Sequence, residues 1–356
     1  MIEMKEEKMK IYQIVEDYNN EKHAGSKATN DAVAILSELG AKGVPVLVAT
    51  RDQGILGKVK RQIKFYKDWK KVYKAVDRDS ILILQNPFKI RALGRFQVLT
   101  KLKRNKNVRI ISLIHDVELL RYDTAKSRAE FKETLEIADQ LIVHNDSMKQ
   151  WFIEHGVPES KLVSLEIFDY LSDKSSDIPT EFSKKVIIAG NLATEKSPYV
   201  YELGKVSNVA FDLLGVYYEP VEQPSNINYR GAFPPDDVPN ELSSGFGLVW
   251  DGPSVESCVG ETGDYLRYNN PHKLSLYISS SLPVVIWSEA AEAKFVEQHQ
   301  VGITVSSLHE LKEKLDTISE ADYQQMVTNT KKIKEQLQDG HYLKTAISTA
   351  LKQLGK

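Results

Sequence analysis

One short stretch of the chain combines a helix start with groups that suit a diphosphate. In the sequence YNNPHKL, Asn270 is expected to cap a helix whose first turn holds Pro271, His272 and Lys273. The free N–H groups and the positive end of the helix dipole lie at the same point as the lysine ammonium. We therefore expect this stretch to bind a nucleotide diphosphate, and the alternative is a well-capped surface helix.

A second candidate for anion binding follows the apolar run KVIIAGN. Gly190 and Asn191 end this run, and Lys196 lies a few residues further along the chain. Small residues and a lysine at a strand-to-helix junction leave room for a diphosphate and supply a charge for it. Ser197 followed by Pro198 predicts the start of the next helix, and we interpret these two residues as structural.

Two residues suited to acid-base chemistry follow another apolar run, VRIISLI. These are His115 and Asp116, which at the end of a strand can transfer a proton or contact a sugar hydroxyl. In the alternative interpretation, Asp116 caps the next helix and Arg121 pairs with Glu118. The convergence of polar groups where a cleft is expected favours the functional interpretation.

The loop HAGSKATND, after the first apolar run, is a further candidate. Gly25 permits a tight turn, and Ser26 and Lys27 then face an anion or a sugar hydroxyl at the start of a helix. The alternative is an ordinary turn capped by Ser26 or Thr29. An NAD-dependent oxidoreductase is disfavoured, because its dinucleotide-binding loop needs several glycines where this loop has one.

These candidates all follow short apolar runs of strand length, which are separated by amphipathic stretches. The runs are 11–15, 44–50, 81–85, 108–114, 140–145, 162–168, 185–191, 209–215, 226–231, 246–252, 283–288 and 301–306. Runs that are apolar on both faces predict parallel strands buried between helical layers. We therefore predict an α/β fold with two Rossmann-like doubly wound domains facing a cleft.

A polar connector near 169–184 divides the chain. We assign 1–178 to an N-terminal domain and 179–340 to a C-terminal domain, both Rossmann-like; the family resemblance described below implies that the first binds the acceptor and the second the nucleotide-sugar. Residues 341–356 are expected to form a C-terminal helix with an apolar stripe that must be buried. Because ligands bind beyond the carboxyl ends of parallel strands, the candidate residues should meet in the cleft.

The composition excludes several classes of protein. Among 356 residues, 47 are basic and 49 acidic, and this net charge of −2 argues against nucleic-acid or membrane-surface binding. No apolar run is long enough for a transmembrane helix, and residues 1–10 lack the apolar core of a secretion signal. The single cysteine, Cys258, excludes an intramolecular disulfide and a multi-cysteine zinc site. We expect a cytoplasmic protein.

Three features resemble sites but favour structural interpretations. The D-x-D sequence at 77–79 precedes its strand, which places it at the sheet edge opposite the cleft. His144, His155 and His299 have no second ligand at a suitable spacing, so we predict no metal site. The basic and aromatic patch at 58–71 is suited to an acidic or glycosylated polypeptide, although a solvated helix face is the simpler interpretation.

Four sequence segments resemble bacterial two-domain (GT-B) glycosyltransferases. They are AGSKATNDAV, HDVELLR, AGNLATEKSP and YLRYNNPHKLSLYISSSLPVVIW. The chain is most similar to the glucosyltransferase 3 family, and also to galactofuranosyltransferase-like sugar transferases. The resemblance implies a metal-independent enzyme without a cofactor, which uses a UDP-sugar held mainly by the C-terminal domain. It also implies a final helix that crosses back to the N-terminal domain.

The resemblance assigns the candidate residues to two sides of the cleft. Those implied at the nucleotide-sugar are Gly190, Asn191, Lys196, Asn270, His272 and Lys273. Those implied at the acceptor or sugar are Gly25, Ser26, Lys27 and His115. Family members often carry an arginine after G-N-L, whereas this chain continues Ala193-Thr194-Glu195-Lys196.

The implied reaction moves a hexose or N-acetylhexosamine, glucose or GlcNAc favoured, from UDP to O-linked GlcNAc on a serine-rich-repeat adhesin. Lys273 and the helix start would stabilise the leaving UDP, and an inverting reaction would use His115 or Asp116 as its base. The resemblance also implies a homo-oligomer, with a tetramer favoured. The alternative is a non-catalytic GT-B subunit that binds glycosylated adhesin and supports a partner transferase.

Overall fold

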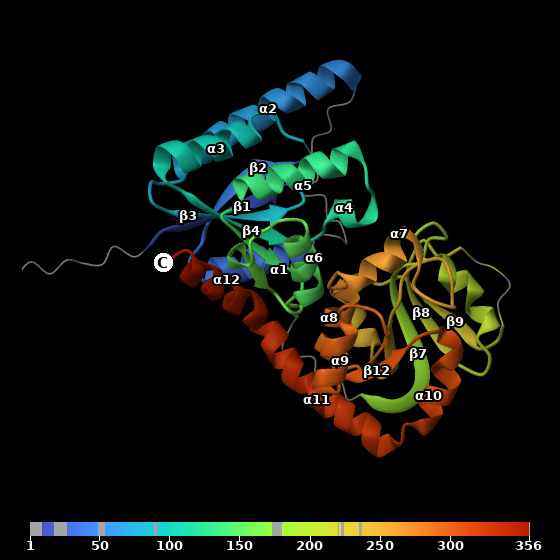
Figure 1. The fold of residues 1–356 in the computed structure, drawn as a ribbon. Helices are drawn as coiled ribbons and strands as arrows, with labels where there is room; N and C mark the ends of the chain where they lie inside the picture. The colour runs from blue at the N-terminus through green and yellow to red at the C-terminus, as the bar shows by residue number, and fades with distance from the viewer. Residues whose placement is uncertain are drawn as a thin grey trace, which may run out of the picture.

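The computed structural model describes residues 9–17, 27–48, 54–88, 91–172, 180–219, 221, 224–234 and 237–355. These residues form two α/β domains, each built on a parallel sheet covered by helices (Figure 1). The predicted fold class is therefore confirmed. Within the described ranges, no helix is both long and apolar enough to cross a membrane.

The N-terminal sheet has the strand order β2-β1-β3-β4-β5-β6. Its strands are β1 (Ile11–Asp17), β2 (Lys42–Leu47), β3 (Ile81–Asn86), β4 (Arg109–Ile114), β5 (Gln140–Val143) and β6 (Leu162–Ser164). The central strands are buried on both faces, which explains their continuous apolar sequences. The chain leaves β1 toward one edge and returns at β3 on the other side, so the topological switch point lies between β1 and β3.

Among the described residues, six α-helices and the 3-10 helix η2 (Glu159–Lys161) lie between these strands. The α-helices are α1 (Lys27–Glu38), α2 (Gly54–Ala75), α3 (Arg95–Lys106), α4 (Glu118–Arg121), α5 (Ala125–Ile137) and α6 (Asp146–Glu154). Helix α1 buries the predicted stripe, including Ala32, Ile35 and Leu36. It is followed by Gly40 in the left-handed conformation, with φ 85°, as the sequence predicted.

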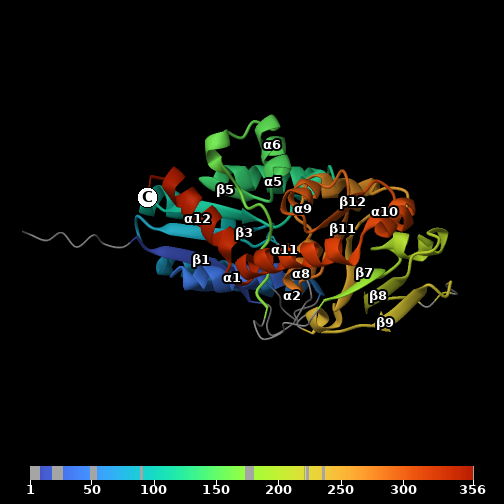
Figure 2. The same ribbon diagram turned by 90° about the horizontal axis from the view of Figure 1, so that it is seen from below.

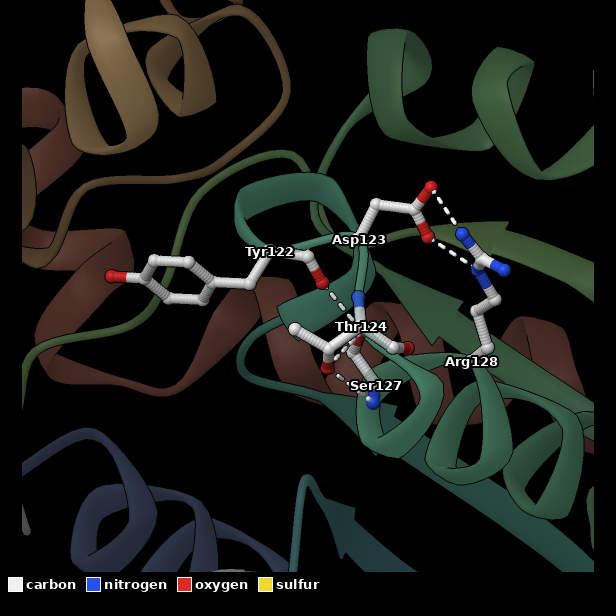
Figure 3. A network of polar contacts seen from close by, with 5 residues as sticks. All are labelled: Tyr122, Asp123, Thr124, Ser127 and Arg128. Carbon is white, nitrogen blue, oxygen red and sulfur yellow. Dashed lines mark hydrogen bonds and ion pairs between the residues drawn. The ribbon is translucent and has the colours of Figure 1, made fainter.

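The start of α5 is fixed by a capping network (Figure 3). The Thr124 side chain accepts a hydrogen bond from the Ser127 backbone N–H, and the Ser127 hydroxyl accepts one from the Thr124 N–H, which completes a capping box. Arg128 pairs with Asp123, with 2.7 Å between Nη2 and Oδ2. The network holds the turn between α4 and α5, while the Tyr122 ring points away from it (Figure 3).

The C-terminal sheet has the strand order β12-β11-β10-β7-β8-β9. Its strands are β7 (Glu181–Asn191), β8 (Phe211–Val216), β9 (Ile227–Gly231), β10 (Ser244–Val249), β11 (Val284–Trp287) and β12 (Gly302–Val305). Counted from β7, this is the order of dinucleotide-binding folds, with the switch point between β7 and β10. Every predicted strand is thus present in one of the two sheets.

The helical segments of this domain are shorter. They are η3 (Pro198–Lys205), η4 (Val238–Glu241), α7 (Gly260–Gly263), η5 (Asp264–Arg267), α8 (His272–Ser279), α9 (Ala293–His299), η6 (Leu308–Glu310) and α10 (Leu311–Thr317). As predicted, Ser197 occupies the N-cap position of η3 and Pro198 begins its first turn, but the Ser197 side chain makes no capping hydrogen bond. Its hydroxyl donates to the Asn191 carbonyl at 2.8 Å, and the segment that follows is a 3-10 helix.

The last two helices, α11 (Glu320–Gln338) and α12 (His341–Gln353), link the domains (Figures 1 and 2). Helix α11 packs on α8, whereas α12 packs on β5, β6 and α1 of the N-terminal domain. The chain turns between them at Gly340, where a Cβ atom would lie 2.7 Å from Ile35 Cγ1. The two Asp169 carboxylate oxygens accept from the N–H groups of Tyr342 (3.1 Å) and Leu343 (2.7 Å) at the start of α12.

This carboxylate gives a first testable pH dependence. Burial raises the pKa of Asp169 to about 7, even though the two α12 amides lower it. Between about pH 4 and about pH 7, Asp169 therefore keeps its proton in the folded chain but has lost it in the unfolded chain. As the pH rises through this range, the free energy of unfolding falls, by up to about 4 kcal/mol from this group.

The expected result is a difference in slope between wild type and Asp169→Asn when urea unfolding is followed across this pH range. The asparagine cannot titrate, so the component that falls with pH should be absent from the variant. Other groups, such as His272, titrate in both proteins and cancel in the comparison. Equal slopes would contradict the prediction.

Candidate active site

Lys273 lies against Gly190 at the switch point of the C-terminal sheet. Gly190 is near the end of β7 with φ 136°, a conformation that side chains disfavour. A Cβ atom built there would lie 3.3 Å from Lys273 Cε and 3.9 Å from Nζ. The lysine side chain thus crosses over the glycine backbone, and the missing side chain leaves space for it.

The Lys273 ammonium lacks a carboxylate partner within hydrogen-bonding distance among the residues that the structure describes. Burial lowers its pKa, and although the Asp251 charge opposes this effect, the Lys196 charge adds to it. The residue is part-buried, so its charge loses part of its hydration without gaining a bonded carboxylate among the described residues. A bound diphosphate would supply the missing negative charge at the start of α8.

The loop after β7 brings Lys196 into the cleft. Asn191 shapes this loop, because its side-chain oxygen accepts from the Ala193 N–H at 2.9 Å. The Lys196 charge affects the pKa values of both Lys273 and Asp116, which belong to different domains. Lys196 is therefore a second cation at the cleft, whereas Asn191 mainly holds the turn.

Asp251 and Tyr277 complete this side of the site and were not predicted as site residues. Asp251 follows β10, across the switch point from Gly190, and its carboxylate accepts from the Gly252 N–H at 2.9 Å. The Tyr277 hydroxyl accepts from the Ala189 N–H at 2.9 Å and fixes α8 against β7. Asp251, like Gly190, lies at the end of an apolar run, so the sequence pattern that indicates Gly190 also indicates Asp251. Only the strand order shows that the two residues lie at the ends of neighbouring strands.

The predicted role of Asn270 as helix cap is wrong, whereas its predicted role as a diphosphate ligand stays a prediction. Pro271 occupies the N-cap position of α8. The Asn270 amide instead donates to the His144 carbonyl at 2.7 Å and accepts from Asn145 Nδ2 at 2.7 Å, and both partners belong to the N-terminal domain. Its backbone N–H donates to His144 Nδ1 at 2.9 Å. Asn270 therefore connects the two domains.

His272 is a neutral ring within the cleft floor. It packs against Tyr170, with 5.2 Å between ring centroids, and Phe168, with 6.3 Å. Burial lowers the pKa of His272 to about 4, and the nearby Lys27 charge lowers it further. At neutral pH His272 therefore adds no positive charge for a diphosphate, and of the predicted YNNPHK residues only Lys273 provides one.

His115 and Asp116 lie at the carboxyl end of β4 in different environments. His115 is bound through Nε2 to Gln85 Oε1 at 2.7 Å and stacks on Phe168. Asp116 accepts from Arg121 Nη2 at 2.7 Å and from the Tyr265 hydroxyl at 3.2 Å. Burial raises the Asp116 pKa and Arg121 lowers it.

Asp116 consequently serves as an anchor between domains. Tyr265 belongs to the C-terminal domain, its hydroxyl also accepts from the Val117 N–H at 2.9 Å, and the Arg121 guanidinium lies over its ring. The expected alternative pair, Arg121 with Glu118, is present at 3.5 Å. The predicted helix cap at Asp116 is wrong, because Val117 occupies that position in α4. Of the two predicted acid-base groups, His115 is the better candidate.

The β1–α1 loop is only partly described. Gly25 and Ser26 lie outside the described residues. Lys27 is the first residue of α1, where its ammonium pairs with Asp31 at 2.7 Å, donates to the Leu171 carbonyl and lies over the Tyr170 ring. These contacts tie Lys27 to the segment after β6, and its predicted role at the acceptor stays a prediction.

A cavity of about 300 Å³ lies at the switch point of the N-terminal sheet. It is lined by the ends of β1 and β3 and the start of α1, including Val15, Thr29, Gln85 and Phe88. Gln85 joins this cavity to His115 through the hydrogen bond described above. Such a cavity is large enough for a small ligand or a sugar ring.

The candidate metal sequence at 77–79 lies before β3, at the opposite end of the sheet from the cleft. Asp77 accepts from Lys10 Nζ and the Tyr12 hydroxyl, both at 2.9 Å. Across the described ranges, no group of three or more His, Cys, Asp or Glu side chains is arranged to hold a metal ion.

Comparison with known proteins identifies the family. The model for the N-terminal domain of glucosyltransferase 3-like proteins matches residues 10–167, and the model for their C-terminal domain matches residues 186–350. The chain belongs to the glucosyltransferase 3-like family. Its relatives are named as glycosyltransferases, and this family member is a glycosyltransferase.

Two relatives of this glucosyltransferase 3-like chain differ in their sugars. The chain is 32% identical over 333 residues to beta-1,6-galactofuranosyltransferase WbbI of Escherichia coli, covering 93% of this chain and 95% of that protein. It is 24% identical over 251 residues to glucosyltransferase 3 of Streptococcus gordonii, covering 69% and 72%.

Solved structures share the fold of this glucosyltransferase 3-like protein at low sequence identity. Anabaena HepE, solved with UDP-glucose, has a TM-score of 0.61 at 11% identity, covering 98% of this chain and 100% of that one. A trehalose 6-phosphate synthase from Burkholderia multivorans has a TM-score of 0.62 at 10% identity, with coverages of 98% and 97%. These likenesses support the two-domain GT-B architecture.

Proposed function

We propose that this protein transfers a hexose or N-acetylhexosamine from a UDP-sugar to a hydroxyl group of a glycan acceptor, without a metal ion. The proposal rests on the Lys273 ammonium, which lies over Gly190 at the start of α8 and has no bonded counter-charge in the part of the chain that the structure describes. The negative charge of a UDP diphosphate would compensate this cation. The cation also lies at the switch point of the C-terminal sheet, where parallel α/β sheets bind their ligands.

In the proposed reaction, the bond between the anomeric carbon and the diphosphate oxygen breaks, and its electron pair leaves with UDP. Lys273 and the N–H groups at the start of α8 stabilise this charge as it develops, with Lys196 as a second cation. The acceptor approaches from the N-terminal cavity. In an inverting reaction, His115 takes the proton of the acceptor hydroxyl.

The proposed acceptor is O-linked GlcNAc on a serine-rich-repeat adhesin, and the favoured donors are UDP-glucose and UDP-GlcNAc. Family membership supports this choice. A second candidate is the transfer of galactofuranose to another glycan, which the higher identity to the galactofuranosyltransferase favours. A screen that combines UDP-glucose, UDP-GlcNAc, UDP-galactose and UDP-galactofuranose with GlcNAc-peptide and free-glycan acceptors separates the two. No transfer from any donor would count against both.

The alternative of a non-catalytic subunit, which binds glycosylated adhesin and supports a partner transferase, makes a different prediction. Such a subunit has no need for a cation at a diphosphate site. Calorimetric titration with UDP distinguishes the two functions, because the absence of binding would favour the non-catalytic subunit.

Adding EDTA is expected to leave the rate of transfer unchanged. In the proposed mechanism Lys273, Lys196 and the α8 N–H groups neutralise the leaving diphosphate, which is the role of the metal in metal-dependent transferases. The rate is measured as UDP release, with a manganese-dependent glycosyltransferase assayed in parallel as the control that loses activity. Complete loss that manganese or magnesium restores would contradict metal independence.

We also propose that the protein forms a homo-oligomer, with a tetramer favoured, on the basis of the family resemblance. Multi-angle light scattering at micromolar concentration should give a molar mass that is a multiple of 40.3 kDa. A monomer mass across the whole concentration range would contradict this part of the proposal.

A further inference from the structure

Helix α2 has a second apolar face that is not buried by the protein. Its inner face packs Phe65, Trp69 and Val72 into the core, so the tryptophan of the predicted basic and aromatic patch is not on the surface. The exposed apolar residues are Ile55 (82%), Leu56 (79%), Val59 (54%), Ile63 (48%) and Tyr66 (40%). Their spacing places them on one outer side of the helix.

The same helix concentrates positive charge. It contains eight basic residues and one acidic residue, a net charge of +7, whereas the whole chain carries −2. At 100° per residue, Lys60, Lys67 and Lys71 border the exposed apolar stripe. The surface of α2 is therefore strongly basic although the whole chain is slightly acidic. The argument against membrane-surface binding used the net charge of the whole chain and does not apply to this helix.

The turn before α3 extends this face. Gln62 holds the turn in place, since its amide nitrogen donates to the Arg91 carbonyl at 3.0 Å and its oxygen accepts from the Leu93 N–H at 2.8 Å. Leu93 is 56% exposed. We refer to the five exposed α2 residues and Leu93, with their bordering lysines, as the α2 surface. It lies on the outer side of the N-terminal domain, away from the C-terminal domain (Figure 1).

We propose that the α2 surface docks the protein on an anionic lipid bilayer. A helix with an apolar stripe and a lysine-rich border lies in the interface of such a bilayer, with its apolar side chains between the acyl chains and its lysines among the anionic headgroups. This inference goes beyond the proposed function, because it requires neither a particular donor nor a particular acceptor.

Charge and shape favour a bilayer over other occupants. A second copy of the chain meeting this one through the same face would bring two helices of +7 together, which repel. A polypeptide partner is usually held in a groove or along a sheet edge, whereas the outer face of a single helix is convex. Nucleic acid would match the lysines but would leave the apolar stripe in water.

The test is co-sedimentation of the full chain with vesicles of phosphatidylcholine alone or mixed equally with phosphatidylglycerol. Wild type should bind only the mixed vesicles, and added salt should weaken the binding. The triple variant Ile55→Gln, Leu56→Gln and Val59→Gln should lose at least about tenfold in partition coefficient. These side chains are exposed, so the thermal midpoint and the transfer rate with soluble substrates should not change.

A second variant removes charge and keeps the apolar stripe. Replacing Lys60, Lys67 and Lys71 with glutamine should also reduce binding to the mixed vesicles by at least about tenfold. A matched control replaces lysines outside α2, on α10 and α11, and should bind as wild type does: Lys314→Gln, Lys331→Gln and Lys332→Gln. The control for the apolar stripe is Tyr217→Gln with Val221→Gln, two exposed residues of the C-terminal domain.

Three outcomes would overturn the proposal. The first is no binding of wild type to either vesicle, and the second is equal binding by wild type and the α2 variants. The third is that the α2 variants bind vesicles as wild type does but differ from it in molar mass. That result would show that the α2 surface is an interface between two copies of the chain. Because the soluble transfer assay is independent of vesicles, failure of docking leaves the proposed function standing.

Discussion

Replacing Lys273 with alanine is expected to weaken UDP binding by about 10- to 150-fold, the equivalent of roughly 1.5–3 kcal/mol for a charge-assisted hydrogen bond. The ammonium lies at the start of α8, where the helix dipole and the N–H groups act on the same anion. Calorimetric titration of the purified variant with UDP measures the loss directly.

The same substitution should not destabilise the protein without ligand. Lys273 is part-buried, has a pKa lowered by burial and lacks a bonded counter-charge among the described residues, so its replacement breaks no ion pair. The thermal midpoint is expected to be equal to or above that of wild type. Lys314→Ala, at an exposed position of α10, is the control and should change neither quantity. Wild-type UDP affinity in Lys273→Ala would remove the basis of the proposed site.

Gly190→Ala is expected to reduce both stability and UDP affinity. At φ 136° an alanine is strained, at a cost of about 1–3 kcal/mol, and its Cβ would lie 3.3 Å from Lys273 Cε. The lysine must then move away from the position from which, in the proposed mechanism, it would contact the diphosphate. We expect UDP affinity to fall about tenfold, measured by the same titration.

Gly156→Ala separates strain from the effect on the site. Gly156 also has a positive φ, of 84°, but no atom lies within 4 Å of the added Cβ. Both variants should lose stability in urea unfolding, and only Gly190→Ala should lose UDP affinity. In a Lys273→Ala background the Gly190 substitution should have little further effect on affinity. Equal losses of UDP affinity in the two glycine variants would show that strain alone is responsible.

The fold was largely predictable because buried parallel strands are continuously apolar. Runs such as 81–85 and 108–114 have no polar face, and this pattern indicates a strand that is buried on both sides of the sheet. The order of the strands was not predictable, since it depends on which strands pair. Without this order, the switch points that bring Gly190 beside Lys273 and Asp251 could not be located from the sequence.

The site was predictable where it depends on position along the chain. The sequence singled out Lys273 and Gly190 because one lies at the start of a helix and the other at the end of a strand, and the structure brings them together. Asn270 and Asp116 have equally suggestive positions, but their partners, such as His144 and Tyr265, lie in the other domain, more than a hundred residues away in sequence. Sequence indicates that a polar side chain needs a partner, and only the packing of the domains identifies it.

The path of α12 has a consequence for synthesis of the chain. The N-terminal sheet is complete once residues up to 172 have been made, but α12, which packs on β5 and β6, is made last. Translation at about 5–20 residues per second leaves roughly 10 to 35 seconds before α12 has been made. During this interval the nascent N-terminal domain exposes the apolar surface that Tyr342, Leu343 and Ile347 later cover. Ribosome-bound chains of intermediate length should therefore be the form of this protein that chaperones bind most strongly.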